Sequence, residues 1–255
     1  ITKAYYSNEK KYIFWILISR DYLYILNMKL LLLTILPSIA IVVFFVKSDR
    51  FKEPTKEIIK VFMYGILITI PAFYFNTYLG DYYDRYTNFS EALKGSFLSA
   101  GPVEEILKLM VLYFFVYKMK DFNEPIDGIV YGITASLGFA TLENLYYVYL
   151  LADYFEVTSM QLAFVRAFSA VPAHAAFGIV MGYFFMRYAY IKKQENLILA
   201  FLVPAFLHSI YNYYVVTDYY ISFALIIFTW IFGIRMFFSL RKKQKRKRTE
   251  YEKKI

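Results

Sequence analysis

Apolar residues gather into seven long runs along the chain, each about as long as the roughly 20 residues that a helix needs to cross a bilayer. The runs cover approximately residues 30–46, 59–79, 97–117, 126–152, 164–188, 197–215 and 220–239. Backbone polar groups inside a bilayer must be satisfied within helices. The pattern therefore predicts an all-α polytopic membrane protein with about seven transmembrane helices that enclose their polar residues. The content of 59% hydrophobic residues agrees with this class.

The segment before the first run has a different character. Its one apolar stretch, Tyr12–Leu26, is interrupted by Arg20 and Asp21, and no small-residue cleavage site of a secretory signal peptide follows it. We therefore expect residues 1–27 to be an N-terminal extension outside the core. The core is expected at 28–240, followed by a basic tail at 241–255.

Charges between the runs predict the orientation in the membrane. The segment 47–60 has five Lys or Arg residues, and the tail 241–255 has nine of them against two Glu. The segments 118–125 and 187–195 are also basic, whereas the alternate connections carry few cations. The positive-inside rule places these basic segments and the C-terminus in the cytoplasm. A basic run beside a membrane helix favours binding to anionic membrane lipids, not to nucleic acid.

The run 97–117 carries three charges near its middle, at Glu104, Glu105 and Lys108. A single charge at the bilayer centre costs roughly 2.5 to 3.5 kcal/mol, so these side chains are not expected to face lipid. Lys108 follows Glu104 by four residues and Glu105 by three, so it can pair with either on one helix face. Taken alone, the run fits a structural ion pair as well as a site with one carboxylate left for chemistry.

Other runs also carry polar residues that are unusual inside a bilayer. They are Glu143 and Asn144 on 126–152, His174 on 164–188, and His208 with Asn212 on 197–215. In the predicted orientation, the carboxylates and both histidines lie about seven to ten residues from the outer helix ends, or roughly 10 to 15 Å below the surface. Helices that run in opposite directions thus bring these residues to one depth, and we expect them to meet.

Small residues recur at every fourth position beside these polar residues. The repeats are Gly128, Gly132, Ser136 and Ala140 before Asn144, and Ala170, Gly178 and Gly182 around His174. Such repeats let membrane helices approach closely. They predict that the polar residues face the interior of the bundle.

The polar set favours the activation of water. The chain has no cysteine, which excludes disulfides, zinc–thiolate sites and a cysteine nucleophile. A desolvated glutamate can take a proton from water that attacks a carbonyl, and His208 with Asn212, on one helix face, can stabilise an oxyanion. Alternatively, two histidines and a glutamate can hold a catalytic zinc ion with an open position for water. The residues leave both mechanisms open.

Four motifs in order, on four separate runs, carry a family resemblance. They are EExxK at Glu104–Lys108, FxxxEN at Phe139–Asn144, HAxxG at His174–Gly178 and HxxxN at His208–Asn212. With these motifs the chain resembles PrsW-type intramembrane proteases, part of the superfamily of CAAX proteases and bacteriocin-processing enzymes. The resemblance runs from about Leu30 to Leu240.

The resemblance implies an intramembrane protease domain at 28–240 in a bacterial cytoplasmic membrane. Its substrate would be a single-pass membrane protein, and the best-known substrate of the family is an anti-sigma factor that is cut on its extracytoplasmic side. The predicted depth of the polar residues fits that side. Type II CAAX prenyl proteases have EExxxR and FxxxH instead, so Glu143 stands at the position of their histidine. A transmembrane regulator is therefore favoured over a prenylated substrate.

Our prediction is an endopeptidase in which glutamate activates water. The assigned roles are Glu104 as general base oriented or assisted by His174, His208 with Asn212 as oxyanion site, Glu105 with Lys108 as supporting ion pair, and Glu143 with Asn144 as supporting or direct participants. No metal or other cofactor is favoured, because Lys108 would repel a dication. The zinc alternative would use His174, His208 and Glu104. Buried Glu and His residues also occur in proton- or ion-coupled transporters, but no inverted repeat supports that class.

Overall fold

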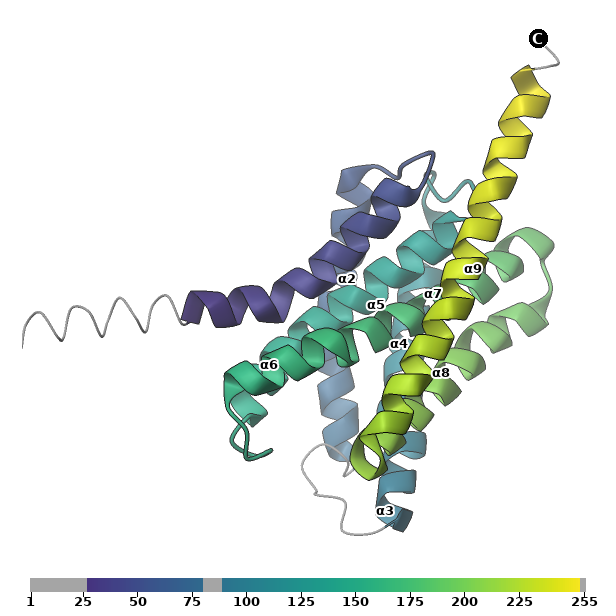
Figure 1. The fold of residues 1–255 in the computed structure, drawn as a ribbon. Coiled ribbons are helices and arrows are strands. Elements are labelled where there is room, and N and C mark those ends of the chain that lie inside the picture. Colours follow the sequence, from purple (N-terminus) through teal and green to yellow (C-terminus); the bar gives the residue numbers. More distant parts are fainter. Residues whose placement is uncertain (1–26, 80–88, 253–255) are drawn as a thin grey trace, which may run out of the picture.

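The computed structural model describes residues 27–79 and 89–252, with side chains as far as Gln244, and every regular element in these ranges is helical. The first described helix is Asn27–Ser48. It is followed by α2 (Thr55–Tyr78), α3 (Phe89–Lys94), the π-helical turn η1 (Gly95–Ala100), α4 (Gly101–Phe114), the short 3₁₀ helix η2 (Val116–Lys118), α5 (Asp127–Tyr146), the π-helical turn η3 (Tyr147–Leu151), α6 (Ser159–Phe168), α7 (Ala170–Ile191), α8 (Gln194–Thr217) and α9 (Tyr219–Glu252). Figure 1 shows these helices as one bundle. The predicted extension lies almost wholly outside the described residues.

Each of the seven apolar runs contains a helix, so the prediction of an all-α membrane protein is confirmed. Within the described ranges, five segments are long and apolar enough to cross a membrane: Asn27–Ser48, Thr55–Tyr78, Ser159–Ile191, Gln194–Thr217 and Tyr219–Gln244. The other two runs correspond to α4 and α5, which carry polar and charged residues inside the bundle. Other helices surround these residues, so they need not meet lipid.

Helix α5 forms the centre of the bundle. It packs between α2 and α7, and nearly all its side chains are buried. A Cβ atom added to Gly182 of α7 would collide with the backbone oxygen of Gly128 on α5, and one added to Gly132 would collide with the oxygen of Gly178. The four-residue repeats of small residues therefore form the contact between α5 and α7, where only glycine permits the observed approach.

The predicted helix over 164–188 is interrupted. It consists of α6 and α7, which meet at Ser169. Pro172 in the first turn of α7 has no N–H to donate to the carbonyl of Phe168, which weakens the continuation of α6. The indole Nε1 of Trp230 on α9 donates to the carbonyl of Pro172 at 2.9 Å. This break allows α6 to turn and present its own side chains to the end of α5.

Helices α4 and α5 each adjoin a π-helical turn. Turn η1 precedes α4, and Pro102 follows directly in the first turn of α4. Turn η3 continues α5 beyond Tyr146. π-Helical turns are rare and often lie beside functional sites. Here they flank the segments that carry Glu104 and Glu143.

The segments predicted to be cytoplasmic lie at one end of the bundle. The side chain of Gln244 near the end of α9 donates to Asp49, after the first helix, at 3.0 Å, and also to Glu124, before α5. The ammonium of Lys192, at the end of α7, donates to the hydroxyl of Tyr117 at 2.6 Å. The four basic segments thus share one face, as the topology prediction requires. The side of the membrane that this face occupies stays a prediction.

Candidate active site

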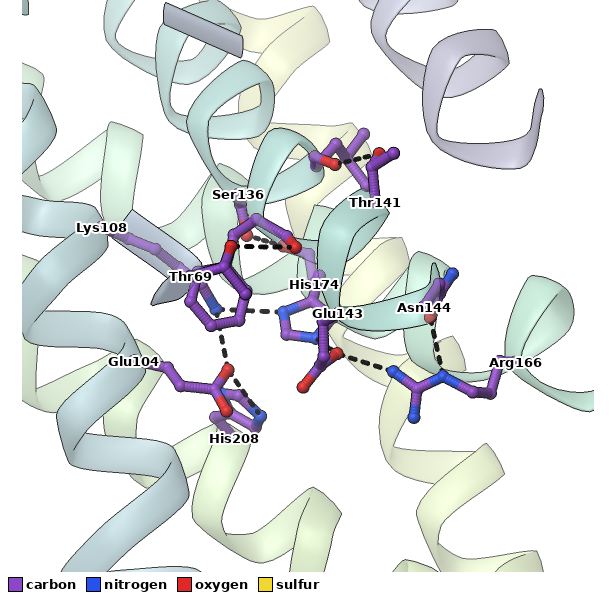
Figure 2. A network of polar contacts seen from close by, with 12 residues as sticks. Thr69, Glu104, Lys108, Ser136, Thr141, Glu143, Asn144, Arg166, His174 and His208 are labelled. Carbon is purple, nitrogen blue, oxygen red and sulfur yellow. Dashed lines mark hydrogen bonds and ion pairs between the residues drawn. The ribbon is translucent and has the colours of Figure 1, made fainter. Parts of the chain in front are cut away.

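A cluster of buried polar side chains lies where four helices meet (Figure 2). Glu104, Glu105 and Lys108 come from α4, Glu143 from α5, His174 from α7 and His208 from α8, and each is at most 5% exposed. The structure therefore brings together the carboxylates, the lysine and both histidines that the common depth predicts to meet. Residues up to 104 positions apart in the chain thus lie together, and the ammonium of Lys108 contacts Glu104, Glu105 and His174.

Lys108 occupies the centre of the cluster. Its Nζ lies 2.7 Å from Glu105 Oε1 and 3.5 Å from Glu104 Oε2, so the predicted pairing with both glutamates is confirmed. The same nitrogen donates to Nδ1 of His174 at 3.0 Å. It also lies 4.3 Å from the centre of the Phe139 ring, which can stabilise a desolvated cation. The Lys108 ammonium thus contacts two buried carboxylates and donates a hydrogen bond to a histidine.

The partners of His174 determine its tautomer. An ammonium has no lone pair to accept a hydrogen bond, so Nδ1 must accept from Lys108. Nε2 then carries the proton and donates to Glu143 Oε2 at 3.0 Å. The hydroxyl of Ser136 fixes the helix locally by donating to the His174 carbonyl at 2.6 Å. Both ring nitrogens are engaged, and Lys108 is the residue that contacts both His174 and Glu104. The predicted role of His174 in orienting or assisting Glu104 stays a prediction.

His208 approaches the cluster from the other side. Its Nδ1 lies 2.8 Å from Glu105 Oε1 and donates to that carboxylate, which leaves Nε2 as the unprotonated nitrogen of a neutral ring. Nε2 lies 3.9 Å from Glu104 Oε2. The ring stacks on Phe177, with 5.0 Å between ring centres. His208 is therefore held by Glu105 and points its free nitrogen toward Glu104.

Sequence reasoning missed the role of Arg166, which lies near the start of the apolar run 164–188. From α6 its guanidinium donates to Glu143 Oε2 at 2.6 Å and to Asn144 Oδ1 at 2.7 Å (Figure 2). It also lies 3.9 Å from the centre of the Tyr147 ring. Asn144 therefore helps to hold Arg166, which in turn neutralises Glu143. The available signal was a cation at the outer end of an apolar run that follows a run with an unpaired glutamate.

Asn212 stands apart from the cluster. It is half-buried on α8, one turn beyond His208, and in the described part of the chain no hydrogen bond joins it to the cluster. Its assignment to an oxyanion site stays a prediction.

The three glutamates differ in how firmly they are held. Glu105 has partners at 2.7 and 2.8 Å, and Glu143 has partners at 2.6 and 3.0 Å. The partners of Glu104 lie at 3.5 and 3.9 Å, which is beyond or at the limit of a hydrogen bond. Glu104 is therefore the most loosely held of the three carboxylates. The second oxygen of Glu105, Oε2, is buried without a hydrogen-bonding partner.

The donors Glu104, His174 and His208 are of the kinds that hold zinc, and their ligand atoms lie within 4.8 Å of one another. Each histidine also has a carboxylate on its other nitrogen, a common arrangement around zinc. However, the ammonium of Lys108 is 3.0 Å from Nδ1 of His174, the nitrogen that would face the metal. As the side chains stand, the ammonium and a dication would share one space, so this arrangement does not fit a bound metal.

Comparison with known proteins agrees with the motifs. The family described as "PrsW family intramembrane metalloprotease" matches residues 53–240. Protease PrsW of Geobacillus kaustophilus (strain HTA426) is 34% identical over 206 residues, which cover 76% of this chain and 84% of that protein. Protease PrsW of Clostridioides difficile (strain 630) is 33% identical over 208 residues, which cover 79% and 85%, respectively. Protease PrsW of Bacillus subtilis (strain 168) is 33% identical over 213 residues, which cover 79% and 90%.

No solved structure matches the chain. The family match and the relatives confirm the resemblance that the four motifs carry, and the matched segment includes every residue of the polar cluster. The chain belongs to the PrsW family of intramembrane proteases.

Proposed function

We propose that this intramembrane protease hydrolyses a peptide bond of a membrane-anchored protein with a water molecule that Glu104 activates. The observation that carries the proposal is the loose hold on Glu104 beside two firmly paired glutamates. A general base needs an oxygen that is free to accept a proton from water, and it must stand close to the reacting groups. Oε1 of Glu105 already accepts from Lys108 and His208. Oε2 of Glu143 already accepts from His174 and Arg166.

Glu104 and His208 together can position the water. Both Glu104 Oε2 and the unprotonated Nε2 of His208 are acceptors, and the 3.9 Å between them allows one water to donate to both. The water oxygen attacks the carbonyl carbon while its proton passes to Glu104. Glu104 then protonates the amide nitrogen as the carbon–nitrogen bond breaks, which restores the carboxylate.

The negative charge that develops on the carbonyl oxygen needs a donor. With Nδ1 protonated toward Glu105, Nε2 of His208 has no proton to give, so we move His208 from the oxyanion role to the positioning of water. Lys108 is the cation closest to Glu104, and a preformed positive charge in a water-poor site stabilises such an oxyanion strongly. Asn212 is retained as a second hydrogen-bond donor to the oxyanion.

The substrate that fits an intramembrane site of this kind is a single-pass membrane protein, with an anti-sigma factor as the first candidate. Glu143 lies 16 residues beyond Asp127 on α5, so about 24 Å separates the site from the basic end of the bundle. If that end is cytoplasmic, as the positive-inside rule predicts, the C-terminus is cytoplasmic and cleavage occurs nearer the extracytoplasmic face. The expected location is a bacterial cytoplasmic membrane.

Reconstitution tests this function directly. The purified protein in lipid vesicles, mixed with a candidate single-pass anti-sigma factor, should produce two fragments whose new termini mass spectrometry places near the outer end of the substrate helix. A substrate with the same helix but a scrambled juxtamembrane segment is the matched control. Cleavage at the basic, cytoplasmic end would contradict the proposed side.

The family description favours a second mechanism, in which Glu104, His174 and His208 hold a metal ion. It would require the Lys108 ammonium to leave its place beside His174. Elemental analysis of active protein distinguishes the two mechanisms. The glutamate mechanism expects well under one zinc ion per chain and activity that survives strong chelation, whereas stoichiometric zinc with loss on chelation and rescue by added metal would contradict it.

A further inference from the structure

A second buried cluster of carboxylates lies at the basic end of the bundle. Asp49 and Glu53 belong to the connection between the first helix and α2, and Asp127 is the first residue of α5. They are 2%, 7% and 0% exposed, and one oxygen from each lies within 4.8 Å of the others. About 24 Å along α5 separates this carboxylate cluster from the candidate active site.

Neighbouring groups hold one oxygen of each carboxylate. Asp127 Oδ2 accepts from the backbone N–H groups of Asn123 and Glu124 at 2.8 and 2.6 Å. Glu53 Oε2 accepts from the hydroxyl of Tyr131. Asp49 Oδ1 accepts from the backbone N–H of Phe51 at 3.2 Å and from the side chain of Gln244 at 3.0 Å. The positions of the three carboxylates are therefore fixed by partners from several segments.

Three side-chain oxygens in and beside this cluster have no hydrogen-bond donor among the described residues. Asp49 Oδ2, Asp127 Oδ1 and Gln244 Oε1 are all buried and unpaired. The amide nitrogen of Gln244 donates to Asp49 and Glu124, which places this amide beside the carboxylate cluster. Among the side chains that the structure describes, no lysine or arginine forms an ion pair with Asp49, Glu53 or Asp127. Buried acceptors without partners and like charges without a cation are unfavourable.

We propose that the carboxylate cluster binds a hard divalent cation of the Mg²⁺, Mn²⁺ or Ca²⁺ type. The ligands would be carboxylate oxygens of Asp49, Glu53 and Asp127 together with the amide oxygen of Gln244. These cations prefer oxygen ligands and carboxylates above all, whereas the absence of nitrogen and sulfur donors from this set disfavours zinc and copper. A bound cation would tie the end of α9 to the start of α5 and to the connection before α2.

The rival occupant is a proton. Burial raises the pKa of Glu53 to about 7, because desolvation disfavours the charged carboxylate. A proton shared among the carboxylates would relieve part of their repulsion without any metal. The two occupants predict different responses to added cation, so one titration separates them.

The test uses the full chain, purified in detergent, stripped of metal and titrated with Mn²⁺ under electron paramagnetic resonance detection. We expect saturation near one Mn²⁺ per chain, displacement by Mg²⁺ or Ca²⁺, and a higher unfolding temperature with Mn²⁺ than with sodium at equal ionic strength. Asp127→Asn should weaken Mn²⁺ binding at least tenfold. Asp153→Asn is the matched control, because Asp153 is exposed beyond the opposite end of α5 and should leave binding unchanged.

Three outcomes would overturn the proposal. The first is the absence of saturable Mn²⁺ binding and of a stability shift in the unmodified protein, which is the result expected for a proton. The second is equal binding by Asp127→Asn, or by Asp49→Asn if the first variant does not fold. The third is loss of binding in Glu104→Gln, which would place the ion in the candidate active site. None of these measurements depends on proteolytic activity, so failure here and failure of the proposed protease mechanism are separate results.

Discussion

The two buried polar clusters of this protein handle charge in opposite ways. In the candidate active site, three glutamates face two cations, Lys108 and Arg166. In the carboxylate cluster at the basic end, Asp49, Glu53 and Asp127 face no described Lys or Arg partner. The first cluster is therefore stable with its own side chains and leaves one loosely held carboxylate for chemistry. In the second, the proposed divalent cation would supply the missing positive charge.

The two clusters also differ in the chemical groups that they contain. Histidines in the active-site cluster can accept and donate protons between carboxylates, as proton transfer requires. The carboxylate cluster offers only oxygens, which suit a hard cation. The ordinary pKa of a solvent-exposed carboxylic acid lies well below neutrality. Burial alone therefore does not make a carboxylate catalytic. The neighbours decide whether it receives a proton from water or a metal ion.

The largest effect is expected from Glu104→Gln, which keeps the shape of the proposed base but removes its ability to accept a proton. Cleavage in vesicles should fall about 10²- to 10⁴-fold while the unfolding temperature stays near that of the unmodified protein. Glu57→Gln is the matched control, because Glu57 pairs with Lys60 on α2, far from the cluster. Unchanged cleavage by Glu104→Gln would end the assignment of Glu104 as base.

Lys108→Met removes the cation that balances the cluster. Buried carboxylates without a counter-charge should cost about 3 to 5 kcal/mol of unfolding free energy, measured by chemical unfolding in detergent, and cleavage should be lost. We expect the variant to remain low in zinc. If the variant instead bound stoichiometric zinc and kept its activity, the Lys108 ammonium would occupy the position of a metal ion. The active-site cluster would then be a metal site, and the contrast between the two clusters would be wrong.

Arg166→Gln leaves Glu143 without its strongest partner. Because the arginine side chain is 12% exposed, we expect a smaller loss than for Lys108, about 2 to 3 kcal/mol. Adding Glu143→Gln should recover part of this loss, since no uncompensated charge then remains. Arg187→Gln is the control, because Arg187 bonds the neutral side chain of Asn196. Strictly additive losses in the double variant would show that the pair does not act as one unit.

Of the four substitutions, Gly182→Ala should reduce cleavage the least. Its added methyl group would press against the backbone of α5 at Gly128, close to the carboxylate cluster. The cost should be about 1 to 3 kcal/mol, with Mn²⁺ binding weakened more than cleavage. Gly233→Ala is the matched control, because its methyl group would meet only the side chain of Ile179. Equal losses of Mn²⁺ binding and of cleavage would show that the two clusters are coupled through the contact between α5 and α7.

The sequence by itself determined the helical membrane class, the approximate positions of seven helices and the family. These follow from local patterns, because the length of an apolar run and the spacing of small residues can be read within one segment. The common depth of Glu104, Glu143, His174 and His208 also followed, since the alternation of helix direction converts positions along the chain into depths in the membrane.

Only the tertiary structure decided which side chains touch. Arg166 pairs with Glu143 because a break at Ser169 turns α6 toward the end of α5, and no local pattern reveals that contact. Gln244 reaches Asp49 across 195 residues of sequence, so the carboxylate cluster leaves no motif. The tautomers of His174 and His208 depend on partners from other helices as well. Such contacts arise from the packing of rigid helices around one another, which hydropathy and spacing within a segment do not encode.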